Sequence, residues 1–152
     1  MRYDLLDDRL EWPLAERREG GPWRLGHGLT VVGPGWWPLV RRAFAHAAET
    51  PGATVRRVRQ KCAVLEVWFA HPAPLARAQL DAFSARIRRA SRSRCEACGA
   101  AVLPPPPAAP PSRNHCSRCA DRLRDLALAG RRGAEIALWE ERAGGPWPPR
   151  VW

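Results

Sequence analysis

Residues 93–119 read SRCEACGAAVLPPPPAAPPSRNHCSRC, and they include four of the five cysteines in this chain of 152 residues. The four cysteines form two pairs with two residues inside each pair, and 17 residues separate the pairs. Two such pairs can hold one zinc ion between four thiolates at about 2.3 Å, which closes a tetrahedral site. The sequence therefore predicts a structural zinc site, with Cys95, Cys98, Cys116 and Cys119 as its ligands.

The residues around the cysteine pairs favour a compact zinc module over residues 95–130. Gly99 follows the first pair and can adopt the positive φ that a knuckle turn often needs. The second pair opens an expected helix that ends near residue 129, so Cys119 would lie in its first turn, where the helix dipole favours a thiolate. A knuckle followed by a pair on a helix resembles a treble-clef zinc finger, here with a Pro-rich, polyproline-like loop at 104–111.

Other interpretations of the cysteines stay open at this point. The two pairs could be redox dithiols or inert thiols, and His115 could replace a neighbouring cysteine as a metal ligand. The fifth cysteine, Cys62, is expected to be a buried thiol in a β-hairpin.

The start of the chain and its hydropathy predict a cytoplasmic protein. Asp4, Asp7 and Asp8 stand where a signal peptide would need a basic start and an apolar stretch. Gly and Pro interrupt the longest uncharged stretches, so no membrane span is expected. In a reducing cytoplasm, cysteines are more often metal ligands or core thiols than disulfide partners.

The spacing of apolar residues predicts an α+β fold. Apolar residues three and four apart predict a helix at 37–49 and an amphipathic helix at about 75–92. Between these helices, residues 53–70 contain two runs rich in β-branched and aromatic residues, which predict a short antiparallel hairpin. We therefore expect two helices packed on this hairpin, followed by the C-terminal four-cysteine module.

The composition along the chain predicts four segments. An acidic N-terminal strap is expected at 1–22 and the small α+β domain at 23–94. The zinc module follows at 95–130, and residues 131–152 are expected to form a short helix and a tail rich in Pro and Trp.

The charge of the chain points to an anionic partner. The formal net charge is +10, from 25 basic and 15 acidic residues, and every basic residue except Lys61 is Arg. Residues 51–94 contain ten basic and two acidic residues, a net +8. Arginine clusters bind phosphates bidentately. The candidate nucleic-acid contacts are Arg56, Arg57, Arg59, Lys61, Arg86, Arg88, Arg89, Arg92 and Arg94.

No enzymatic activity is expected, because the chain contains no Gly-rich phosphate loop, no H-E-x-x-H and no G-x-S-x-G. The sequence favours a zinc-stabilised protein that binds nucleic acid. The main alternative is a protein-interaction module, such as an inhibitor or immunity-type protein, that binds an acidic protein. In that case Trp12, Trp147 and Trp152 are candidate contacts.

Three motifs occur in a characteristic order: Gly35-Trp36-Trp37-Pro38-Leu39, then Val58-Arg59-Gln60-Lys61, then Cys95-Glu96-Ala97-Cys98-Gly99. This order resembles a group of small uncharacterised bacterial and phage zinc-knuckle proteins with a G-W-x-x-L helix start, a V-K-x-K-F-G-x-L hairpin and a C-E-x-C-G knuckle. The resemblance implies the fold and the metal, and no activity. The chain departs from the group's hairpin at Cys62, where the group has Phe, and at Glu66, where it has Arg.

Overall fold

A computed structural model describes residues 15–16, 24–25, 32–103, 113–131 and 133–145. The elements in these residues are β1 (Ala15–Glu16), β2 (Arg24–Leu25), the 3-10 helix η1 (Pro34–Trp36), α1 (Trp37–Glu49), β3 (Thr54–Lys61), β4 (Val64–Ala70), α2 (Pro74–Arg92), α3 (Ser117–Leu128) and α4 (Ala134–Ala143). The predicted α+β class is confirmed, and so are the two helices that flank the hairpin. Among the described residues, no helix is both long and apolar enough to cross a membrane.

Several predictions concern residues that lie outside this description. They are most of the N-terminal strap, the Pro-rich loop at 104–111, and Trp12, Trp147 and Trp152 in the terminal segments. Within the strap and the residues after it, β1 and β2 pair antiparallel, with Ala15 opposite Leu25.

The hairpin consists of β3 and β4, which pair antiparallel from Thr54 opposite Ala70 to Lys61 opposite Val64. Cys62 and Ala63 form its turn and have positive φ angles of 49° and 59°. Positive φ at both central residues is typical of a type I′ turn, whose twist matches that of the strands. The prediction of a buried thiol at Cys62 is wrong: the side chain is exposed, because it belongs to the turn and not to a strand.

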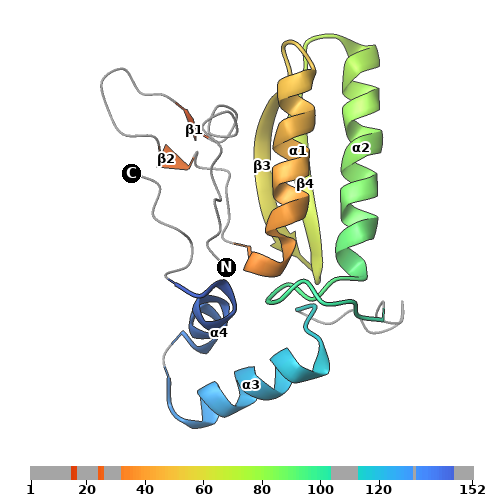
Figure 1. The fold of residues 1–152 in the computed structure, drawn as a ribbon. Helices are drawn as coiled ribbons and strands as arrows, with labels where there is room; N and C mark the ends of the chain where they lie inside the picture. The colour runs from red at the N-terminus through yellow and green to blue at the C-terminus, as the bar shows by residue number, and fades with distance from the viewer. Residues whose placement is uncertain (1–14, 17–23, 26–31, 104–112, 132, 146–152) are drawn as a thin grey trace.

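Both long helices pack on the same face of the hairpin and form one apolar core with it (Figure 1). Its members include Val40 and Phe44 of α1, Val67 of β4, and Phe83 and Ile87 of α2. Pro38 stands in the first turn of α1, where a missing N–H costs no hydrogen bond. The helix therefore starts where the sequence predicts.

Helix α2 also covers the outer edge of β4. The Ser84 hydroxyl donates to the Val67 carbonyl, and the Leu65 N–H donates to Ser91 Oγ at 2.9 Å. A strand edge covered in this way cannot pair with another chain. The second face of the hairpin, opposite the core, carries Trp68, whose side chain is exposed.

A second apolar cluster lies around the cysteines, where α3 and α4 pack against each other (Figure 1). It includes Cys95, Cys119, Leu138 and Trp139, and Trp37 of α1 packs against both clusters. The predicted short last helix is confirmed as α4.

Replacing Phe44 by Ala should lower the free energy of unfolding by about 3–5 kcal/mol, because the ring is 1% exposed and its removal leaves a cavity in the core. Chemical denaturation measures this loss. Arg77→Ala is the control: the side chain is exposed on α2 and should change stability by less than about 0.5 kcal/mol. A silent Phe44→Ala variant would show that α1 does not pack as described.

Candidate metal centre

The first cysteine pair lies in a tight turn directly after α2. The Cys95 N–H donates to the Ala100 carbonyl at 2.8 Å, and the Gly99 N–H donates to the Cys95 carbonyl at 2.9 Å. Gly99 has a φ of 75°, a conformation that glycine adopts without steric cost. A β-bridge between Arg94 and Ala101 closes the base of this turn. The turn has the local geometry that the sequence predicts for a knuckle.

The second pair lies at the start of α3. Cys116 is the N-cap residue of this helix, and the Cys119 N–H donates to the Cys116 carbonyl at 3.0 Å. Cys119 is therefore in the first turn, where the positive end of the helix dipole stabilises a thiolate.

The four sulfur atoms of Cys95, Cys98, Cys116 and Cys119 all lie within 4.8 Å of one another. Cys98 Sγ and Cys116 Sγ are 3.7 Å apart, far beyond the 2.05 Å of a disulfide bond, and all four are free cysteines. Cys95 and Cys119 are buried, whereas Cys98 is exposed. The chain thus brings together the four predicted ligands in a cluster that can hold a metal ion.

The electrostatics of the cluster favour a bound cation. Burial raises the pKa of the Cys95 and Cys119 thiols. At Cys116, burial also acts to raise the pKa, but hydrogen bonds from Cys119, Cys98 and Cys95 outweigh it and lower the pKa. Several thiolates so close together repel one another, and a metal cation removes this repulsion.

Glu96, inside the knuckle, is fully buried and joins it to the rest of the molecule. Its carboxylate accepts hydrogen bonds from the Gly33 N–H and from Arg113 Nη1, both at 3.3 Å. Its backbone carbonyl accepts from the Gly35 N–H at 2.7 Å, and its N–H donates to the Asn114 carbonyl at 2.7 Å. The knuckle is therefore connected to the start of α1 and to the residues before the second pair.

Asn114 is a buried side chain that connects the second pair to α2. Its Nδ2 lies 2.9–3.0 Å from the carbonyl oxygens of Ser91, Arg92 and Arg94, and these three acceptors share its two hydrogens. The last carbonyls of a helix have no partner within the helix, so Asn114 caps the end of α2. The C-E-x-C-G motif includes Glu96 but predicts no contact for its side chain, and no motif includes Asn114. The sequence signal that could have pointed to Asn114 is its position, as a polar residue two positions before Cys116.

A second group of possible metal ligands lies beside the cysteines: Glu96, His115 and Glu135. Arg113 lies among them, 3.3 Å from Glu96 and 2.6 Å from Glu135, and its guanidinium supplies the positive charge that a metal would bring. Burial raises the pKa of Glu96 to about 7. Burial lowers the pKa of His115, and the positive charge of Arg113 lowers it further. We assign this group a structural role. His115 belongs to it, and the four-cysteine cluster contains no histidine.

The predicted basic contacts lie on β3, on α2 and just after α2. Glu66 of β4 connects two of them, since its carboxylate lies 2.9 Å from Arg59 Nε and 4.0 Å from Arg88 Nη2. Arg86 differs: its guanidinium carbon is 5.2 Å from the centre of the Phe83 ring, and it borders a cavity with His46 of α1. The structure thus joins the hairpin and α2 clusters through Glu66 but does not bring Arg86 to the same side.

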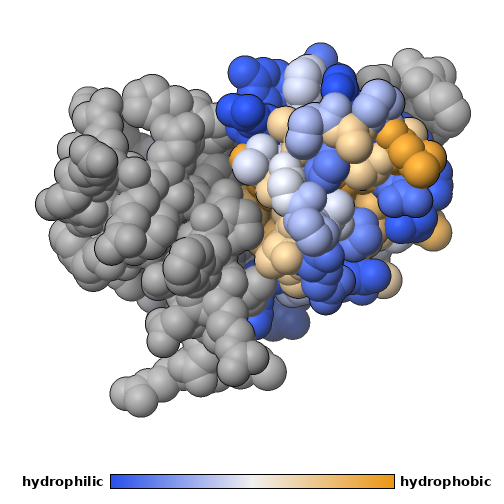
Figure 2. Space-filling model, turned by 90° about the horizontal axis from the view of Figure 1, so that it is seen from above, coloured by the Kyte–Doolittle hydropathy of each residue, from blue (hydrophilic) through white to orange (hydrophobic). Residues whose placement is uncertain are grey.

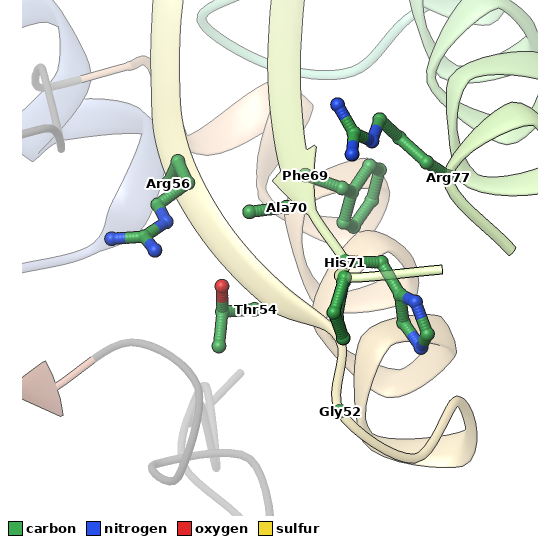
Figure 3. A pocket seen from close by; sticks show the side chains of 8 residues that line it. Gly52, Thr54, Arg56, Phe69, Ala70, His71 and Arg77 are labelled. Carbon is green, nitrogen blue, oxygen red and sulfur yellow. The ribbon is translucent and has the colours of Figure 1, made fainter. Parts of the chain in front are cut away.

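A cavity of about 460 Å³ lies at the end of the hairpin where β3 begins (Figure 3). Its lining includes Arg56 of β3 and Arg77 of α2, together with Phe69 and His71. His71 Nδ1 accepts from the Ala73 N–H, so Nε2 donates to the Pro51 carbonyl at 2.8 Å. His71 therefore holds the connecting loops together, and Arg56 and Arg77 are the basic residues among those that line the cavity.

Comparisons of the chain with models of protein families, with curated protein sequences and with solved structures find no match. The function is therefore inferred from the chain's own residues and their arrangement.

Proposed function

We propose that the protein is a zinc-stabilised, non-enzymatic protein that binds nucleic acid through the basic surface of the hairpin and α2. The observation that carries this proposal is the set of exposed cations in residues 51–94 that lack an acidic partner. Among the described residues, no ion pair involves Arg56, Arg57, Lys61, Arg89, Arg92 or Arg94. Such side chains are available to contact phosphates, and this contact releases counterions.

Zinc is the metal that the cysteine cluster suits best. Four thiolates are soft ligands that favour zinc over the harder divalent cations. Sulfurs around a tetrahedral zinc at about 2.3 Å lie about 3.8 Å apart, which agrees with the 3.7 Å between Cys98 Sγ and Cys116 Sγ. The knuckle and the pair on the helix have the order of a treble-clef finger. With four protein ligands the ion has no open position, so its role is structural.

The exposed apolar residues support nucleic acid over a protein partner. Among the described residues, the large exposed hydrophobic side chains are Trp68, Leu75, Leu103 and Leu128, and they come from four different parts of the chain. Protein interfaces need clustered apolar or aromatic anchors. In the view from above, the described surface is largely hydrophilic, with small separated hydrophobic areas (Figure 2).

Reversing the charge of Arg88, Arg89 and Arg92 together to Glu should weaken binding to both duplex and single-stranded nucleic acid. If three phosphate contacts are lost, the slope of log affinity against log salt should flatten by roughly 2–3 units. Fluorescence anisotropy with labelled oligonucleotides between about 50 and 200 mM salt measures both effects.

The matched control is the reversal of Arg42, Arg124 and Arg131, which changes the net charge equally on other parts of the chain. This control should alter the affinity and the slope far less. Two results would contradict the proposal: no binding of the unaltered protein at about 100 mM salt, or full binding by the Arg88, Arg89 and Arg92 variant. The first result would favour an acidic protein as the partner, and the second would show that nucleic acid does not bind through these arginines of α2.

A further inference from the structure

Trp68 is an aromatic side chain on the face of the hairpin opposite to the one that α1 and α2 cover. Its neighbours on β4, Val67 and Phe69, belong to the core, and successive strand residues point to opposite faces. Trp68 therefore points away from α1 and α2, and 52% of its surface is exposed. Trp68 is therefore not part of the apolar core.

Two arginines of β3 lie close to the Trp68 ring. Arg57 lies directly opposite Trp68 in the strand register, and Arg59 lies opposite Glu66 on the same face. The guanidinium carbons of both arginines are 5.6 Å from the ring centre. These contacts hold the ring against the sheet while half of its surface stays open to solvent.

The charge around Trp68 is almost entirely positive. Glu66 is the acidic residue of β3 and β4, and it pairs with Arg59. Arg57 has no ion pair among the described residues, and Arg56, in the irregular part of β3 beside it, borders the cavity of Figure 3. Ala70 of β4 lines the same cavity. It lies two residues beyond Trp68, which is about 7 Å along the strand.

An exposed aromatic ring with cations close to it is suited to bind a nucleotide. An unpaired base stacks on an exposed aromatic side chain, and neighbouring arginines contact the phosphates on either side of it. In a duplex the bases are paired and stacked on one another, so they do not reach a tryptophan on a sheet surface. We propose that the hairpin binds single-stranded nucleic acid by stacking an unpaired base on Trp68, with Arg56 and Arg57 on the adjacent phosphates.

This inference rests on the proposed function and specifies the form of nucleic acid that the basic surface prefers. Trp68→Ala in the full chain should weaken binding to a 15-nucleotide oligo(dT) about tenfold or more, as expected for the loss of a stacked base. The salt slope should not change, because no phosphate contact is removed. Binding to a 15-base-pair duplex should stay the same.

Two further variants control this experiment. Trp68→Phe keeps an aromatic ring, so it should keep most of the affinity for oligo(dT) but lose the part of the fluorescence quenching that comes from Trp68, one of eight tryptophans in the chain. Leu128→Ala removes another exposed apolar side chain, on α3, and should leave the affinity unchanged. Circular dichroism of each variant checks the fold.

The outcomes separate the two proposals. Suppose that the unaltered protein binds both forms of nucleic acid and that a folded Trp68→Ala variant binds oligo(dT) as tightly as the unaltered protein does. Base stacking is then refuted and the proposed function stands. Equal losses for oligo(dT) and duplex would also refute stacking. If the unaltered protein binds neither form, the proposed function fails, and this inference fails with it.

Discussion

If the cluster holds zinc as proposed, replacing Cys98 by Ser should release the ion and unfold the segment that follows Arg94. Zinc at a structural site contributes on the order of 10 kcal/mol to folding, which is similar to the whole stability of a typical domain. A three-thiolate site cannot retain this free energy. Zinc content by mass spectrometry should fall from about one ion per chain to none, and the far-ultraviolet circular dichroism should lose helical signal.

The loss should be largest in α3 and α4. These helices pack on a small cluster in which Cys95 and Cys119 are themselves buried members, beside Leu138 and Trp139. Without the metal, few apolar contacts remain to hold the helices there. The larger core between α1, the hairpin and α2 contains no metal ligand, so part of the helical signal should remain.

Cys62→Ser is the matched control, because it makes the same chemical change at an exposed cysteine in the hairpin turn, outside the cluster. This variant should keep its zinc and its melting temperature. The zinc site would be refuted if metal-free protein had an unchanged spectrum and melting temperature, or if Cys98→Ser retained the ion at full stoichiometry.

The elements of the fold could be predicted where the apolar residues of an element lie on one face and that face packs in the core. In α1 and α2 the apolar residues recur with the helical period, so both helices and the buried positions Phe44 and Phe83 could be read from the sequence. The cysteine spacing likewise predicted which four side chains cluster, because a two-residue gap and a helix start are local features.

The strand β4 shows why other features could not be predicted. It reads VLEVWFA and is apolar on both faces, so the pattern does not tell the core face from the open one. The exposure of Trp68 follows from the hairpin having both helices on one side, which is a tertiary property. The turn at Cys62 also has no local signal, since neither of its central residues is the Gly or Asn that usually marks positive φ.

The contacts around the knuckle are long-range as well. The Glu96 carboxylate accepts a hydrogen bond from the Gly33 N–H, and the two residues are 63 positions apart in the sequence. No periodic pattern in the sequence predicts such a contact. These contacts make the short segment before α1 part of the metal centre's support. They also explain why glycine occurs at Gly35, directly before the tryptophans of the G-W motif.

Replacing Gly35 by Ala should destabilise the protein severely although every cysteine remains in place. A Cβ atom at this position would lie 2.2 Å from the Cys95 carbonyl oxygen and 2.3 Å from the Gly99 nitrogen. Both are backbone atoms of the knuckle, held by its own hydrogen bonds, so neither can move aside as a flexible side chain would. We expect a loss of about 4 kcal/mol or more in the free energy of unfolding, measured by chemical denaturation with zinc present.

Gly145→Ala is the matched control for this substitution, because no heavy atom lies within 4 Å of a Cβ at that position and its φ is not positive. It should change stability by less than about 0.5 kcal/mol. Gly35→Ala should also weaken the retention of zinc against a chelator, since separating α1 from the knuckle removes the hydrogen bond between the Gly35 N–H and the Glu96 carbonyl. If Gly35→Ala is as stable as the control, the knuckle does not pack against the start of α1, and the metal centre must fold independently of the hairpin and its helices.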